Sequence, residues 1–311
     1  MTVRAPAPQA AGPRRRAPAR APRRRGPGPL PWIAPALLLI ALVVLWPVYE
    51  MVRTSFLRVS TSGFVRGPAG LDKYRKLLGE ADLGRVLLST VLWTVAVVAL
   101  TMVLSLGLAQ LFDQRFPGRR FARWALIAPW AASVLMTAIG FRWMLDRTAG
   151  VLNTAMTDLG LVDGPRDWLG DPATAWPWMV AVAVFVSLPF TTYTLLAGLQ
   201  TIPGELYEAA RVDGASRWQT YRRLTLPLLR PAFLVGLVIN LINVFNSFPV
   251  IWGMTQGGPS SDTATTTVFV YQLKSSDIGE SAAMSVVNFA LVVVMVLAFL
   301  KVTGRARGEE S

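Results

Sequence analysis

Hydrophobic residues gather in six long blocks along the chain, separated by polar and charged segments. Each block has about 20 residues or more, the length that a helix needs to cross a hydrocarbon core of about 30 Å. Lipid offers no partners to backbone polar groups, and the blocks show no alternation of period two, so we expect helices rather than a barrel. The predicted fold is all-α, a polytopic protein with six transmembrane helices over residues 30–52, 86–112, 121–145, 176–199, 232–253 and 282–302.

Composition agrees with a membrane protein and excludes several chemistries. The 311 residues are 53% hydrophobic and only 16% charged, which leaves too little polar surface for a soluble globule of this size. Without cysteine or histidine, the chain has no disulfide, thiolate nucleophile or imidazole metal site. It also lacks a Gly-Lys dipeptide, and therefore a P-loop, and it has no H-E-x-x-H or G-x-S-x-G motif. We expect no catalytic residue, no metal and no cofactor, and any ATP must bind another subunit.

The net charge of +13 is concentrated near the ends of the blocks, so we expect no nucleic-acid partner. Residues 1–29 are rich in arginine and proline and poor in apolar residues, which predicts a disordered cytoplasmic tail. Contact of this tail with anionic lipid headgroups is the alternative. Residues 30–303 form the six-span domain, and residues 304–311 form a second cytoplasmic tail.

Basic residues near span ends tend to stay in the cytoplasm, and this rule places both termini inside. The loops after the second and fourth blocks are basic and agree with that orientation. The loop at residues 53–85 disagrees, because it is basic and would lie outside; it contains Arg58, Arg66, Lys73, Arg75 and Lys76. Within it, residues 71–78 are predicted to form a short amphipathic helix.

A polar insert at residues 203–227 separates the fourth and fifth blocks, and it carries the signals of two short helices. Pro203 and Glu205 favour the first turn of one helix, and Gly214 favours its C-terminal end. Ser216 and Gln219 have the spacing of a capping box for a second helix. We therefore predict a compact pair of helices rather than a plain linker.

Residues Glu208-Ala209-Ala210, followed by Gly214, resemble the E-A-A-x-x-x-G coupling motif of permease subunits of binding-protein-dependent ABC importers. The segments 197–203 and 213–216 and the dipeptide Leu226-Pro227 resemble the carbohydrate-uptake branch, which includes maltose, trehalose and glycerol-phosphate permeases. Residues 119–121, 150–153 and 256–259 extend the resemblance over most of residues 30–301.

This resemblance implies the type I ABC importer permease fold in a bacterial plasma membrane. The chain would form half of a translocation pathway for a sugar or oligosaccharide, in a heterodimer with a second homologous permease. Two copies of a cytoplasmic ATPase subunit and an extracytoplasmic sugar-binding protein would complete the assembly. The insert, which we call the coupling loop (residues 203–227), would dock on the ATPase through Glu208, Ala209, Ala210, Asp213, Gly214, Leu226 and Pro227.

Two alternative transport functions follow from the same residues. One is an ABC permease for another polar solute, such as a glycerol-phosphate compound. The other is an ion-coupled secondary transporter, which would need acids or histidines at membrane depth. The six blocks lack histidine and nearly lack acids, so the second alternative fits poorly.

Polar residues form a stripe on the fifth block. Gly236, Asn240, Asn243 and Ser247 have spacings that place them on one helical face. They could line the substrate pathway, with Phe248 and Trp252 nearby to stack on sugar rings, or they could hold helices together through hydrogen bonds. The sequence leaves both open. Tyr193 and Asn288 are weaker candidates of the same kind.

Two smaller features lie near span ends. Gln256-Gly257-Gly258-Pro259 predicts a rigid turn, which is either a plain loop or a contact for the binding protein. Arg142 and Asp146, four residues apart, predict an interfacial ion pair.

Overall fold

The computed structural model describes residues 30–308, so the prediction for the tail at residues 1–29 lies outside it. The chain divides into two units, residues 1–48 and 49–311. The first unit contains helix α1 (Leu30–Ile40), the π-helical segment η1 (Ala41–Leu45) and the start of α2 (Trp46–Ser55). Its apolar side chains are largely exposed, as lipid-facing side chains would be.

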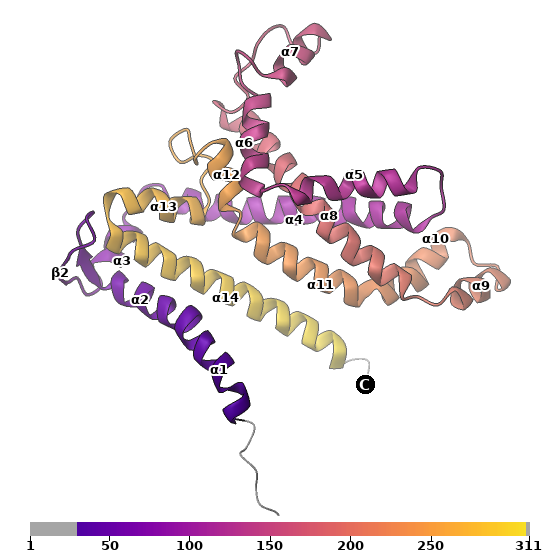
Figure 1. Cartoon of the computed structure of the whole chain (residues 1–311), viewed down its shortest axis with the longest axis horizontal. Coiled ribbons are helices and arrows are strands. Elements are labelled where there is room, and N and C mark those ends of the chain that lie inside the picture. Colours follow the sequence, from indigo (N-terminus) through magenta and orange to yellow (C-terminus); the bar gives the residue numbers. More distant parts are fainter. Residues whose placement is uncertain (1–29, 309–311) are drawn as a thin grey trace, which may run out of the picture. The chain divides into compact units, whose positions relative to one another are not determined.

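Four long helices run through the second unit: α4 (Leu83–Asp113), α8 (Pro172–Gln200), α11 (Leu226–Phe245) and α14 (Ile278–Gly308). Figure 1 shows α4, α8 and α11 side by side, and α14 packs along α11. Trp93 of α4 is fully buried in the core, and its indole N–H donates to Ser247 Oγ at 2.6 Å and to the carbonyl of Val244 at 3.2 Å. The all-helical prediction is confirmed, apart from one small hairpin.

Within the described residues, five helical segments are long and apolar enough to cross a membrane: 32–55, 83–113, 172–200, 217–245 and 278–301. The predicted span at 121–145 differs, because it is divided into α5 (Arg119–Ala131) and α6 (Val134–Met144). Pro129 removes a backbone donor from the last turn of α5. Ser133 then adopts an extended conformation before α6 begins.

The predicted span at 232–253 is also interrupted. Helix α11 ends at Phe245, and α12 (Phe248–Met254) begins after two non-helical residues. Pro249 favours this break, because its ring in a continuous helix would meet the carbonyl of Phe245, four residues earlier. This break gives α12 a direction of its own.

Proline also accounts for the two π-helical segments. Segment η1 contains Val43, four residues before Pro47, and η2 (Tyr221–Thr225) contains Arg223, four residues before Pro227. In a regular α-helix those two carbonyls would clash with the proline rings. The wider π turn moves them aside, so that each helix continues through its proline.

The basic loop at residues 53–85 folds into a hairpin and a short helix. Strands β1 (Leu57–Val59) and β2 (Val65–Pro68) pair antiparallel and were not predicted. Helix α3 (Asp72–Leu78) confirms the helix predicted at residues 71–78. Helix α3 packs on the first turn of α14. Helix α13 (Thr266–Ser276), which directly precedes α14 in the chain, also packs on α14.

Three ion pairs among the described residues join α3 to the start of α14, and we call their four residues, Lys73, Lys76, Asp277 and Glu280, the clasp. Lys73 Nζ lies 2.5 Å from Asp277 Oδ2, and Lys76 pairs with the buried carboxylate of Glu280. Burial alone would raise the pKa of Asp277, but hydrogen bonds from Lys73 and a backbone N–H, together with the nearby lysine charges, hold it below its usual range. Two of the loop's unexpected basic residues are therefore neutralised by acids near the far end of the chain.

Candidate functional site

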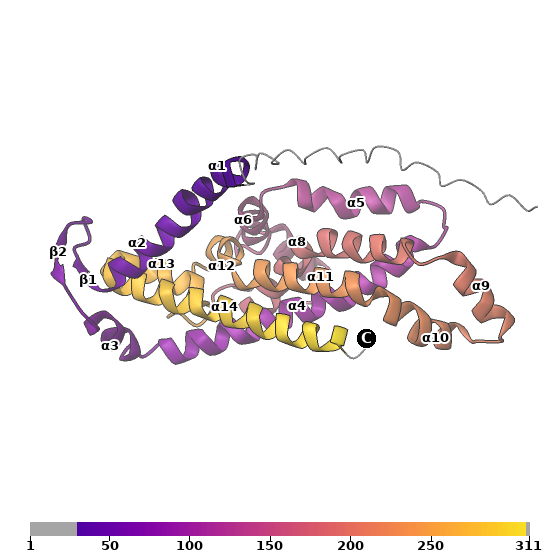
Figure 2. The ribbon, with the colours of Figure 1, turned by 90° about the horizontal axis from the view of Figure 1, so that it is seen from below.

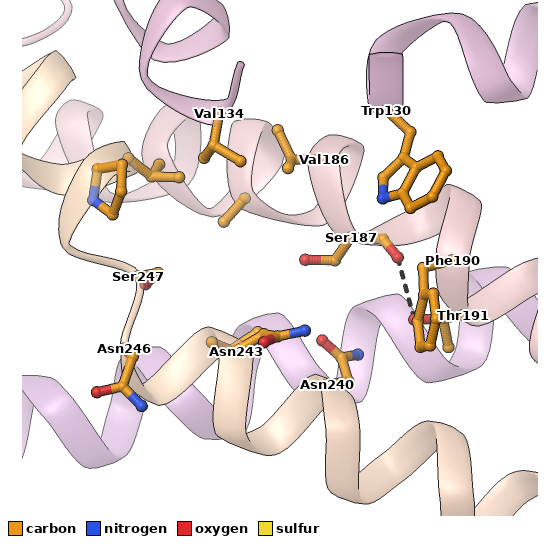
Figure 3. Close-up of a pocket in the computed structure, with 14 residues that line it drawn as sticks. Trp130, Val134, Val186, Ser187, Phe190, Thr191, Asn240, Asn243, Asn246 and Ser247 are labelled. Atoms are coloured by element: carbon orange, nitrogen blue, oxygen red, sulfur yellow. Dashed lines mark hydrogen bonds between the residues drawn. The ribbon is translucent and has the colours of Figure 1, made fainter. Parts of the chain in front are cut away.

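A cavity of about 430 Å³ lies beside the break between α11 and α12 (Figure 3). Its walls come from α8, α11 and α12, with contributions from the end of α5 and the start of α6. The polar lining residues are Ser187, Thr191, Asn240, Asn243, Asn246 and Ser247, and the apolar ones are Trp130, Val134, Ala183, Val186, Phe190, Val244, Pro249 and Val250. None of these lining residues is charged.

Asn240 is the most unusual residue of the cavity. Only 3% of its surface is exposed, yet neither its amide oxygen nor its amide nitrogen has a hydrogen-bond partner within the described residues. Leaving a buried polar group unsatisfied costs about 1–3 kcal/mol. Figure 3 shows the Asn240 and Asn243 side chains directed into the space between α11 and α8. The wall of the cavity therefore contains a buried donor and a buried acceptor that no described residue pairs with.

The other polar groups around the cavity are partly used by the fold. Ser247 Oγ accepts the Trp93 indole N–H, which fixes the helix break against α4. Asn246 donates to the carbonyl of Ile242 at 3.0 Å, and Thr191 donates to the carbonyl of Ser187 at 3.0 Å. All of these polar groups are uncharged, so the lining offers neutral donors and acceptors only.

The structure brings together three of the seven pathway candidates, Asn240, Asn243 and Ser247. Phe248 and Trp252 are turned elsewhere: their rings stack with centroids 5.5 Å apart, and Tyr271 of α13 lies 4.6 Å from Trp252. The hydroxyl of Tyr193 donates to the carbonyl of Arg123 at 3.2 Å, which ties α8 to α5.

Asn288, the seventh candidate, also joins two helices. Its side-chain oxygen accepts from the Thr266 hydroxyl at 2.6 Å, linking α14 to α13. Ser187 and Thr191, on the facing wall, were not predicted as pathway residues. The spacing of four residues between these two hydroxyls was the available signal, because it places both on one face of α8.

The coupling loop folds as its capping signals predict. Helix α9 (Gly204–Val212) ends in a Schellman motif, in which Ala215 N–H donates to the carbonyl of Ala210 and Gly214 N–H to that of Arg211. Gly214 has φ +75°, a conformation that favours glycine. Helix α10 (Arg217–Thr220) begins with the predicted capping box, with both reciprocal hydrogen bonds of Ser216 and Gln219 present.

One face of α9 is open to solvent. Glu205, Glu208, Ala209 and Val212 are exposed at helical spacing, and Val212 reaches 88% exposure. Ala210 lies on the opposite side and is half-buried. Asp213 and Gly214 are exposed in the turn, whereas Leu226 and Pro227 form the first turn of α11, after η2.

The predicted ion pair between Arg142 and Asp146 is not among the ion pairs of the described residues. Asp146 Oδ1 accepts instead from the backbone N–H groups of Ala149 and Thr148 and from the Thr148 hydroxyl. These hydrogen bonds, that from Ala149 foremost, hold the pKa of Asp146 below its usual range. Donors within three residues are fixed by the turn itself, so they outcompete an exposed guanidinium.

The segment at residues 256–259 forms a turn that is packed into the structure. Gly257 has φ +85°, and a Cβ there would lie 2.8 Å from side chains of α13. The Gln256 carbonyl accepts from the Gln272 amide at 3.1 Å, and the Thr263 hydroxyl donates to the carbonyl of Gly258 at 2.7 Å. The predicted turn is thus held by side chains on both sides.

Comparisons with known proteins identify the family to which this sequence is similar. The sequence model of the family described as "binding-protein-dependent transport system inner membrane component" matches residues 86–304. A probable ABC transporter permease protein of Brucella suis is 40% identical over 276 residues, covering 88% of this chain and 96% of the relative. The trehalose/maltose transport system permease protein MalF of Thermococcus litoralis is 32% identical, covering 88% of this chain and 92% of the relative.

A solved structure shares the fold. It is the crystal structure of a bacterial ABC transporter involved in the import of the acidic polysaccharide alginate. One of its chains superposes with a TM-score of 0.78 at 21% identity, covering 88% of this chain and 94% of that chain.

Proposed function

Because this chain belongs to the family of binding-protein-dependent transport system inner membrane components, we propose that it forms half of the translocation pathway of an ATP-driven importer for a sugar or oligosaccharide. The chain has no nucleotide-binding motif, so ATP hydrolysis takes place in a separate subunit. The relative described as a trehalose/maltose transport system permease protein supports a carbohydrate substrate.

The cavity beside Asn240 is the single observation that carries the proposal. The Asn240 amide is buried and directed inward, and it has no hydrogen-bond partner in the part of the chain that the structure describes; an amide can both donate to and accept from a sugar hydroxyl. A phosphate-bearing solute would require a cationic partner at membrane depth, and none of the lining residues is cationic. The cavity therefore supports a neutral polyhydroxy solute over a glycerol-phosphate compound.

The assembly has four further parts in this proposal. A second, homologous permease subunit completes the pathway, two ATPase subunits bind on the cytoplasmic side, and an extracytoplasmic binding protein delivers the sugar. Both termini are cytoplasmic, and so is the coupling loop. The exposed face of α9, with Glu208 and Ala209, docks on the ATPase, where small side chains permit close approach.

The docking step is tested by the double variant Glu208→Ala, Gly214→Asp. An aspartate at φ +75° strains the turn, and the alanine removes the exposed carboxylate. We expect the ATPase subunit no longer to co-purify with the permease and uptake to stop, while the permease remains in the membrane. Asp158→Ala, an exposed change on α7 (Val151–Asp158), is the control. Normal uptake by the double variant would refute the coupling role.

The pathway step is tested by Asn243→Ala in the whole importer. Asn243 is exposed within the cavity, so its truncation should leave assembly intact while lowering uptake. Uptake of labelled maltose, trehalose and glycerol 3-phosphate separates neutral from phosphorylated solutes. Loss of the folded complex would instead assign Asn243 to helix packing, and uptake of glycerol 3-phosphate alone would overturn the neutral-sugar assignment.

A further inference from the structure

The second helix of the coupling loop is continuous with the helix that lines the cavity. Helix α10, η2 and α11 run without a break from Arg217 to Phe245, as Figure 2 shows. At 1.5 Å per residue, about 35 Å of continuous helix joins Arg217 to Asn240; we call this helix, which bends at η2 (Figure 1), the rod. A displacement of α10 therefore reaches the cavity without passing through a loop.

The first helix of the coupling loop has no such continuity. Helix α9 carries the exposed docking face, but its chain reaches the rod only through the turn at residues 213–216. Its inward side is marked by two half-buried residues, Tyr207 and Ala210. The Tyr207 hydroxyl lies 3.3 Å from Thr225 Oγ1, within hydrogen-bond distance.

Thr225 occupies a special place in the rod. It is the last residue of η2, only 6% of its surface is exposed, and α11 begins directly after it. The π turn here accommodates the ring of Pro227, and π turns inside α-helices occur frequently at functional sites. The hydroxyl pair thus connects the docking helix to the rod at the base of α11.

The rod is also in close contact with α8, the opposite wall of the cavity. A Cβ added at Gly198 would lie 2.3 Å from the Cβ of Ala232, so the two helices touch there without an intervening side chain. Gly236, one turn further along, faces Thr191 and Thr194. Motion of α11 near its base therefore bears directly on α8 as well.

We propose that the hydroxyls of Tyr207 and Thr225 form a latch that makes α9 and the rod from α10 to α11 move as one body. Both are positioning residues for energy coupling, an assignment that rests on the proposed function. With the latch intact, movement of the docked α9 shifts the Asn240 end of α11. Without it, α9 moves relative to the rod, and ATP is hydrolysed with less movement at the cavity.

The test uses the importer complex with one reporter in this chain. The chain has no cysteine, so Asn243→Cys supplies its single thiol, exposed within the cavity. The rate at which a small methanethiosulfonate reagent labels this thiol is measured without nucleotide and with ATP and vanadate. The same complex without Cys at this position gives the background. The ratio of the two rates reports how far the cavity responds to the ATPase.

Thr225→Val and Tyr207→Phe each remove one hydroxyl with little change of shape. In each variant the ratio of the two labelling rates should change by about fivefold, toward one. This change is equivalent to about 1 kcal/mol, the contribution of one neutral hydrogen bond. ATPase co-purification and ATP turnover should persist. Thr225→Ser keeps the hydroxyl and should restore the ratio. Tyr221→Phe removes a hydroxyl from a tyrosine of η2 whose ring packs on Trp218, and should change nothing.

An unchanged ratio in both single variants would overturn the latch and leave the docking proposal standing. Loss of the ATPase from the complex would also overturn it, because the pair would then act in docking or folding. Failure of the Glu208 and Gly214 test shows in co-purification and uptake, whereas failure of the latch shows in the labelling ratio of an assembled, ATP-hydrolysing complex. The two proposals therefore fail in different measurements.

Discussion

Replacement of Asn240 by leucine should make the protein more stable and transport slower. The buried amide has no partner within the described residues, and its burial costs about 1–3 kcal/mol. Leucine has a similar volume and no polar atom, so the change removes that cost without opening a cavity. The amide nitrogen and oxygen both lie out of reach of water, so the whole range applies.

The transport effect has the opposite sign. A sugar hydroxyl in the cavity would lose a donor and an acceptor at once, each worth about 1 kcal/mol, so uptake should fall about tenfold or more. Functional sites commonly show this opposition, since groups placed for a ligand are uncompensated without it. Thermal unfolding of the purified complex and uptake of labelled sugar measure the two effects separately.

Asn243→Leu is the matched control, because Asn243 lies three residues away on the same helix but is exposed. Its amide is not buried, so the unfolding midpoint should not rise, although uptake should still fall. A lower midpoint for Asn240→Leu would show that the amide supports the fold. Normal uptake by the same variant would refute its place in the pathway.

Three further changes test other parts of the structure. In Asn153→Asp the side chain still accepts two hydrogen bonds, but the two that the amide donated are replaced by repulsion between the carboxylate and backbone carbonyls. The free energy of local opening of residues 146–168 should fall by about 2 kcal/mol, so their amide hydrogens should exchange faster, and unchanged exchange would contradict this. Gly198→Val should lower the yield of folded complex, whereas Gly236→Ala, with its nearest neighbour at 3.8 Å, should be tolerated. Lys76→Met leaves Glu280 buried without its partner and should destabilise the protein by about 2 kcal/mol, less than for a fully buried pair because Lys76 is 53% exposed. Adding Glu280→Gln should recover most of that loss, and equal destabilisation in the double variant would refute the pairing.

Local features of the fold were predictable because their causes lie within a few residues. The capping box of Ser216 and Gln219 and the glycine turn at Gly214 each depend on four or five neighbouring residues. The long apolar blocks are similarly self-contained, because their length and composition alone make them helical in lipid.

The pathway candidates were only partly brought together because helical periodicity assumes an unbroken helix. Asn240 and Asn243 precede the break at residues 246–247, so they lie on one helical face as the spacing predicted. Phe248 and Trp252 follow it, and α12 turns them toward Tyr271. Pro249 was visible in the sequence, but whether a proline bends or ends a helix depends on what packs around it.

Contacts between distant segments could not be read from the chain. The facing wall of the cavity required knowing that α8 pairs with α11, and no spacing rule supplies that. The hairpin at residues 57–68 has no strongly alternating pattern, since it consists of a three-residue and a four-residue strand.

The clasp has a consequence for the order in which the protein is made. Lys73 and Lys76 precede their partners Asp277 and Glu280 by 204 residues in each pair. While the ribosome is still synthesising the intervening chain, these lysines have no counter-ions in the last helix. The loop after the first span therefore remains cationic and without the ion pairs of the clasp until almost the whole polypeptide has entered the bilayer. Insertion of the start of the last helix is thus also the event that closes the earliest loop.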